Sequence, residues 1–185
     1  MGEVGPLSGM VFIALFVLGS LLIAAFDYLP STEEVQELFK DHSDRISAEA
    51  YISTLSAFFL LWFAGSLRGH LRSSESGNRW ISAIAFGGGV TSSVLIIFGS
   101  VAMQIGAARA GSANELGPNV TTLVYELYSA SLGQGLPIAM AALMAATAAV
   151  AFRTRVFSRW VAWASAIIAL GLLTPYNWAS PGSSL

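Results

Sequence analysis

The chain has 185 residues, of which 55% are hydrophobic and only 11% are charged. A soluble domain carries about 25% charged residues, so this chain lacks the polar side chains needed to cover a globule of its size. The net charge of −2 offers no basic surface for nucleic acid, and the absence of cysteine excludes disulfides, thiolate metal sites and thiol nucleophiles.

Five apolar segments predict membrane-spanning helices. Each is long enough, or nearly so, to cross a hydrocarbon core about 30 Å thick, which takes roughly 20 helical residues. The segments lie near residues 9–26, 48–67, 80–107, 131–152 and 159–174. We therefore expect an all-α protein in which residues 1–185 form a single integral membrane bundle of five transmembrane helices.

The polar stretch between the first two spans predicts a short amphipathic helix. Ser31 followed by Glu34 matches a capping box, in which each side chain satisfies a backbone donor near the other residue. Val35, Leu38 and Phe39 recur at helical spacing, which gives the helix one apolar face. We expect it to cover about residues 31–42 and to lie on the outer membrane surface.

The sequence DHSDR, residues 41 to 45, is the densest group of ionisable side chains and allows two interpretations. Asp41, His42 and Asp44 are possible metal ligands, to which Glu49 and Glu126 could be added. Alternatively, the stretch is a solvated connector between two helices. Consecutive residues at a helix end point in different directions, so we favour the connector and expect no metal.

Glu126 is the most informative acidic residue because its neighbours in LVYELYS are mostly apolar. An ionisable group at membrane depth is a candidate functional residue. If Glu126 lies inside the bundle, Arg45 and Arg109 are its expected partners, and Gln134 could line the same pocket. The alternative is that this helix extends beyond the bilayer and Glu126 is in water. The candidate binding residues are Glu126, Gln134, Arg109, Arg45 and Glu49.

Small residues form faces on two of the predicted spans. In the third span they recur every seven residues, and in the fourth every four, a spacing that lets helix backbones approach closely in lipid. We expect the third span to be central. The residues expected to contact membrane lipids or other membrane subunits are Gly99, Gly106, Ala141, Ala145 and Ala149.

Basic residues predict the orientation, because short loops rich in Lys and Arg stay in the cytoplasm. With five spans, six basic residues fall on the side of the N-terminus: Arg68, Arg72, Arg79, Arg153, Arg155 and Arg159. Three fall on the other side: Lys40, Arg45 and Arg109. We therefore expect a multi-pass protein of the cell membrane with a cytoplasmic N-terminus and an external C-terminus.

Several longer motifs resemble a group of uncharacterised multi-pass membrane proteins common in actinobacteria. The motifs are STEEVQELFKDHSDR, LLWFAGSLRGHLR, AFGGGVTSS and LPIAMAALMAATAAVAFRTRVFSRWVAW. The likeness covers most of the chain and implies a bacterial membrane protein. Such proteins often carry one more helix after the last span counted here, so the resemblance implies that a sixth helix is missing from this sequence. It implies no activity.

The function expected from these observations is non-catalytic, as an accessory or structural subunit of a larger membrane complex. No cofactor is expected, because the chain lacks a pair of membrane-embedded histidines for haem. One alternative is a protein that binds or transports a lipid or small molecule through an outward-facing pocket. A second alternative is a membrane enzyme that uses the outer acidic cluster.

Overall fold

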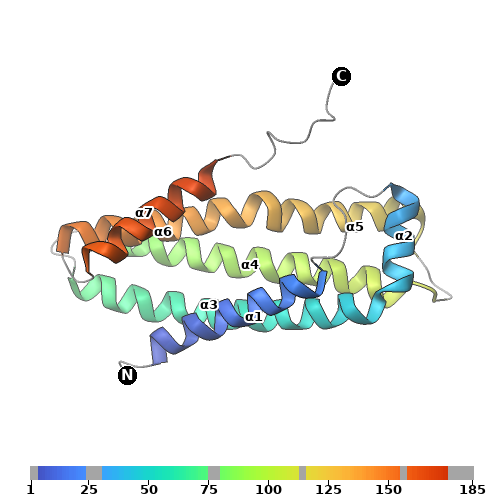
Figure 1. The fold of residues 1–185 in the computed structure, drawn as a ribbon, viewed down its shortest axis with the longest axis horizontal. Coiled ribbons are helices and arrows are strands. Elements are labelled where there is room, and N and C mark those ends of the chain that lie inside the picture. The colour runs from blue at the N-terminus through green and yellow to red at the C-terminus, as the bar shows by residue number, and fades with distance from the viewer. Residues whose placement is uncertain (1–3, 24–30, 75–79, 113–115, 155–157, 175–185) are drawn as a thin grey trace, which may run out of the picture.

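The computed structural model describes residues 4–23, 31–74, 80–112, 116–154 and 158–174 (Figure 1). Within these ranges the chain forms helices and no strand, so the all-α prediction is confirmed. The elements are α1 (Val4–Ile23), α2 (Thr32–Asp41), α3 (Ser43–Ser74), α4 (Trp80–Arg109), α5 (Pro118–Ala130), the π-helical segment η1 (Ser131–Gly135), α6 (Leu136–Thr154) and α7 (Arg159–Leu173).

The long helices lie side by side in one layer, with α4 between α3 and the continuous helix made by α5, η1 and α6 (Figure 1). Helix α1 packs against α3 and helix α7 packs against α6. Both lie on the same face of the layer in Figure 1. The short α2 runs across the end of the bundle where α3 begins.

Among the described residues, four helices are long and apolar enough to cross a membrane: Gly5–Ile23, Ser43–Ser74, Trp80–Arg109 and Pro118–Thr154. Helix α7 is apolar but has only 15 residues. At 1.5 Å per residue it reaches about 22 Å, which is less than the roughly 30 Å of a hydrocarbon core. The fifth predicted span is therefore present as a helix, but the described residues do not confirm a full crossing.

The fourth span begins much earlier than residue 131, because α5 continues into α6 through η1. Pro118 opens α5 at its first position, where a missing N–H costs nothing. Pro137 cannot donate a hydrogen bond to the preceding turn. The π-helical segment lies directly before it, and the Leu136 N–H donates to the Ser131 carbonyl oxygen, five residues back.

The second span is also longer than its apolar core of residues 48–67, since α3 runs from Ser43 to Ser74. Charged residues such as Arg68 and Arg72 end the hydrophobic run, but they are good helix formers and do not end the helix. The capping box of α2 is present: the Ser31 side chain accepts from the Glu34 N–H, and the Glu34 carboxylate accepts from the Ser31 N–H. Helix α2 buries Val35 and Phe39.

Glycines let α4 pack closely on both sides. A Cβ atom on Gly89 would lie 2.5 Å from the Cβ of Ala64 on α3, and one on Gly88 would lie 2.7 Å from the backbone nitrogen of Leu143 on α6. The ring of Phe39, on α2, lies directly against Gly106. The contacts with α3 and α6 place α4 at the centre of the layer, as its small-residue face predicted.

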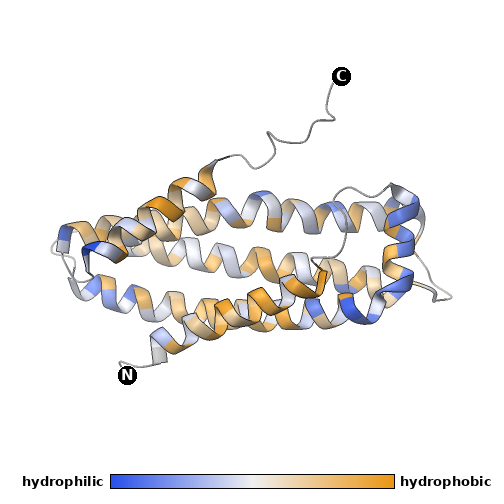
Figure 2. Cartoon of the chain, viewed as in Figure 1, coloured by the Kyte–Doolittle hydropathy of each residue, from blue (hydrophilic) through white to orange (hydrophobic). Residues whose placement is uncertain are grey.

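Hydrophobic residues run along the long helices (Figure 2), and many of the large ones are exposed. Met10 is 69% exposed and Leu170 is 68% exposed, and many residues of α3 and α4 resemble them. Soluble proteins rarely expose apolar surface on this scale. The fold therefore defines a helical bundle of the membrane-protein class.

Candidate functional site

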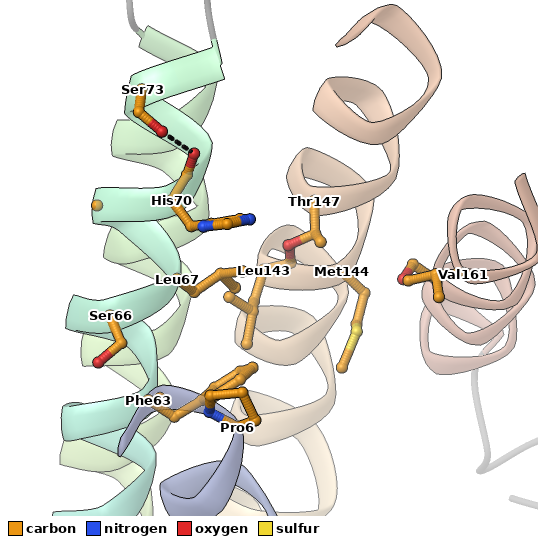
Figure 3. A pocket seen from close by; sticks show the side chains of 13 residues that line it. Pro6, Phe63, Ser66, Leu67, His70, Ser73, Leu143, Met144, Thr147 and Val161 are labelled. Atoms are coloured by element: carbon orange, nitrogen blue, oxygen red, sulfur yellow. Dashed lines mark hydrogen bonds between the residues drawn. The ribbon is translucent and has the colours of Figure 1, made fainter. Parts of the chain in front are cut away.

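A cavity of about 590 Å³ lies between α1, α3, α6 and α7, near the end of the bundle where α1 begins (Figure 3). Pro6 of α1 lies at one edge and Val161 of α7 at the opposite edge. Phe63 and Leu67 of α3 and Leu143 of α6 form apolar walls between them. This volume lies within the range of about 300–1,000 Å³ that is typical of small-molecule sites.

The cavity exists because α1 and α7 pack on different helices. Among the described residues, no Cα atom of α1 comes within 8 Å of a Cα atom of α6 or α7, and none of α7 comes within 8 Å of α3. Helix α1 is held tightly against α3, since a Cβ on Gly9 would lie 2.9 Å from the Phe63 ring. Within the described residues, helices α1 and α7 thus form two walls of the cavity and do not contact each other.

The lining is largely apolar with a few hydroxyl groups. The Ser73 hydroxyl donates to the backbone carbonyl oxygen of His70 at 2.8 Å, and the Thr147 hydroxyl donates to the carbonyl oxygen of Leu143 at 2.7 Å. Both hydroxyl groups therefore donate hydrogen bonds to the backbone of their own helices. Ser73 and His70 are not arranged as a nucleophile and base, because the serine contacts the main chain and not the imidazole.

His70 is the only residue with a charged or imidazole side chain among those that line the cavity. It is exposed, lies one turn before the end of α3, and its imidazole extends toward α6 in Figure 3. The site thus combines an apolar body with a polar rim at one end. Such an arrangement suits an amphiphilic molecule whose apolar part enters the bundle and whose polar part stays at the surface.

The predicted binding residues do not line this cavity. Glu126, Gln134 and Arg109 are exposed on α5, η1 and the end of α4. Arg45 is also exposed, and its guanidinium donates at 2.8 Å to the carbonyl oxygen of Leu22, near the end of α1. The structure therefore does not gather these four side chains into one site.

Glu49 is the exception, because it is 2% exposed inside the bundle. The Ser53 hydroxyl, one helical turn along α3, donates to its Oε1 atom at 2.7 Å. The Oε2 atom is buried and has no hydrogen-bond partner. Glu49 therefore lies apart from the other four candidates in a distinct polar environment.

The residues proposed as alternative metal ligands are not grouped either. Asp41 ends α2, His42 follows it, and Asp44 lies in the first turn of α3. Within the described part of the chain, no three His, Asp or Glu side chains come together as a metal site requires.

The small-residue faces mostly serve contacts within this chain. Gly99 is buried, and a Cβ there would lie 3.4 Å from the Tyr128 ring. Gly106 and Ala141 are also buried. Ala149 is half-buried, and only Ala145 of this set is exposed.

Sequence reasoning missed the cavity, although one signal for it is visible. Ser66, His70 and Ser73 recur at spacings of four and three residues, which places them on one face of a helix. A polar face at the end of an apolar helix marks a surface that avoids lipid. The sequence does not reveal that α1 and α7 border this face.

Comparisons of the chain with protein-family models, curated proteins and solved structures found no match. The likeness to actinobacterial membrane proteins therefore stays an expectation from the motifs.

Proposed function

We propose that this chain is a non-catalytic membrane protein that binds a single-chain amphiphile in the cavity between α1 and α7. The observation that carries the proposal is the cavity itself, with its volume of about 590 Å³ and its apolar walls. Ligand sites of this kind are lined mainly by apolar groups, with a few polar groups that fix orientation. The sequence led us to expect an outward-facing pocket for a lipid or small molecule. The cavity lies at a different place in the bundle, but the proposed ligand belongs to the same class.

The charge at this end of the bundle favours an anionic headgroup. Arg72 lies in the last turn of α3, Arg153 in the last turn of α6, and Arg159 begins α7. Basic residues near a membrane surface attract anionic lipids by about 1 kcal/mol each. His70 adds a further hydrogen-bonding group at the rim. We therefore propose a ligand with one acyl chain and an anionic head.

A pair of glycines on α3 provides the test. Gly69 lines the cavity, whereas Gly65, one turn earlier, does not. Both are exposed, and a Cβ at either position meets nothing within 4 Å. We expect Gly69→Phe to fill the cavity and weaken binding of lysophosphatidylglycerol about tenfold or more, equivalent to at least about 1.4 kcal/mol. Gly65→Phe should bind as the parent does.

Native mass spectrometry of the protein released from nanodiscs measures this binding. The expected result is one saturable lysolipid per chain in the parent and in Gly65→Phe. Non-saturating attachment of several lysolipids to all three proteins would show ordinary detergent-like association and would refute the proposal.

A second candidate is the accessory subunit, and the open packing of α1 favours it. Leu7, Met10, Ile13, Val17 and Leu21 follow one another at spacings of three or four residues, and each is at least half exposed. A helix of another subunit could pack along this face. The same mass spectra would then contain a second chain at fixed stoichiometry, and Gly69→Phe would leave its amount unchanged.

We further propose that α7 completes a five-span topology, with α2 on the outer surface, the N-terminus inside and the C-terminus outside. The basic-residue asymmetry supports this orientation, although Arg79 and Arg155 lie outside the described residues. A reporter that is active only outside the cytoplasm should be active when fused after Leu185. Activity of a cytoplasm-only reporter at that position would show that α7 does not cross.

A further inference from the structure

The buried carboxyl group of Glu49 is not explained by the amphiphile site. Glu49 lies in the first half of α3, whereas the α3 residues that line the cavity run from Phe63 to Ser73, and its backbone oxygen would lie 3.9 Å from a Cβ on Gly19 near the end of α1. An ionisable residue within a membrane helix is a candidate functional residue, and such residues mark ion pathways and proton relays. A carboxylate without a counter-charge is costly in apolar surroundings, so this position needs a chemical reason.

Other polar groups share the layer of Glu49. The amide of Gln104 donates to the Ser47 hydroxyl at 3.4 Å, and Gly89 faces Ala64 farther along the same antiparallel helices. The contacts Ser47–Gln104 and Ala64–Gly89 fix the register of the antiparallel helices α3 and α4. In this register, Ser100 of α4 lies at the level of the turn of α3 that holds Glu49 and Ser53.

Ser100 is 1% exposed, and its hydroxyl oxygen has no hydrogen-bond partner. The ring of Tyr128 lies beside the neighbouring Gly99. The layer thus contains two buried, unpartnered oxygen atoms, one on Glu49 and one on Ser100.

Among the described residues, Glu49 is the only charged side chain that is buried, so no buried cation balances a charge on it. The described part of α1 has no ionisable side chain, and α4 has only Arg109, which is exposed at its end. Helix α5 contributes Tyr125, Tyr128 and the exposed Glu126. On α3 itself, Arg45 lies one turn before Glu49, but it is exposed and its guanidinium donates to the Leu22 carbonyl oxygen.

We propose that Glu49 is a proton-binding site within the bundle, at which the protein takes up and releases one proton. On uptake an O–H bond forms at Oε2 and the carboxyl group becomes neutral, while Oε1 keeps the hydrogen bond from Ser53. The new O–H group requires an acceptor, and the buried Ser100 hydroxyl, which has no hydrogen-bond partner, is a candidate for this role. Release restores the carboxylate, which Ser53 still stabilises through its hydroxyl.

The end of α1 covers this site. A Cβ on Gly19 would lie 2.9 Å from the Ser53 hydroxyl oxygen. The α1 backbone therefore packs closely against the hydroxyl group that donates a hydrogen bond to Glu49. Proton exchange therefore requires either a small displacement of α1 or a path along the hydroxyl groups between α3, α4 and α5.

Dicyclohexylcarbodiimide, an apolar reagent for protonated carboxyl groups, tests the proposal on the full chain in nanodiscs. We expect peptide mass spectrometry to find the adduct on Glu49, with about tenfold less labelling at about pH 10 than at about pH 5. Glu49→Gln should remain folded and lose this adduct, whereas Glu126→Gln should keep it. Labelling that does not change over this pH range would overturn the proposal.

Infrared spectroscopy gives a second measurement that does not depend on reagent access. The parent should show the carbonyl band of a neutral carboxylic acid, which disappears as pH rises and is absent from Glu49→Gln. A spectrum without any such difference between parent and Glu49→Gln would refute proton binding, whatever the reagent labels.

Discussion

Replacing Gly88 by alanine is expected to destabilise the bundle strongly. The added Cβ would lie 2.7 Å from the backbone nitrogen of Leu143 and 2.8 Å from the carbonyl oxygen of Ala139. Both atoms belong to the α6 backbone, so no side chain can rotate away and the two helices must separate. Overpacking costs about 1–3 kcal/mol, and we expect the upper part of that range.

The neighbouring Gly87 provides a matched control. It is exposed, and a Cβ there meets nothing within 4 Å. Alanine is favoured over glycine in helices by about 1 kcal/mol, so Gly87→Ala should be neutral or slightly stabilising. Thermal unfolding of both variants in the same detergent measures the difference, which should be about 5–10 °C. Equal midpoints would mean that α4 and α6 do not pack at Gly88.

Replacing Phe39 by alanine is expected to release α2 from the end of the bundle. Phe39 is 1% exposed, and its ring packs against Gly106 within the cluster that also contains Ile46 and Met103. Removal of a buried phenylalanine ring costs about 3–5 kcal/mol through lost contacts and the cavity left behind. This is the largest effect expected for any truncation on α2.

Limited trypsin digestion measures the release of α2 directly, because the exposed Lys40 follows Phe39 in the chain. Cleavage after Lys40 should be much faster in Phe39→Ala than in the parent. Phe98→Ala, at a position 50% exposed on α4, is the control and should leave the cleavage rate unchanged. An unchanged rate in Phe39→Ala would show that α2 does not depend on this contact.

The helices were predictable because each follows from a local pattern. Apolar runs located the cores of α1, α3, α4 and α6, and the Ser31–Glu34 capping box located the start of α2. The ends were less predictable, because hydropathy measures burial in lipid and not helix formation. Arg68 ends an apolar run without ending α3.

The sites were harder to predict because they depend on which helices meet. Nothing local indicates that α1 packs on α3 while α7 packs on α6, and the cavity results from that choice. Glu49 is buried for the same reason, because neighbouring helices cover it. Its position in the sequence alone places it at the edge of an apolar span. Glu126 showed the opposite outcome: its neighbours in sequence are apolar, yet it is exposed.

Photo-crosslinking with a lysophosphatidylglycerol that carries a diazirine in its acyl chain tests the central proposal most directly. If the cavity binds the amphiphile, peptide mapping should place the main adducts on Phe63, Leu143 and Met144, and unlabelled lysolipid should compete them away. Adducts spread over lipid-facing residues such as Met10 and Leu170, with none in the cavity and no competition, would contradict the proposal.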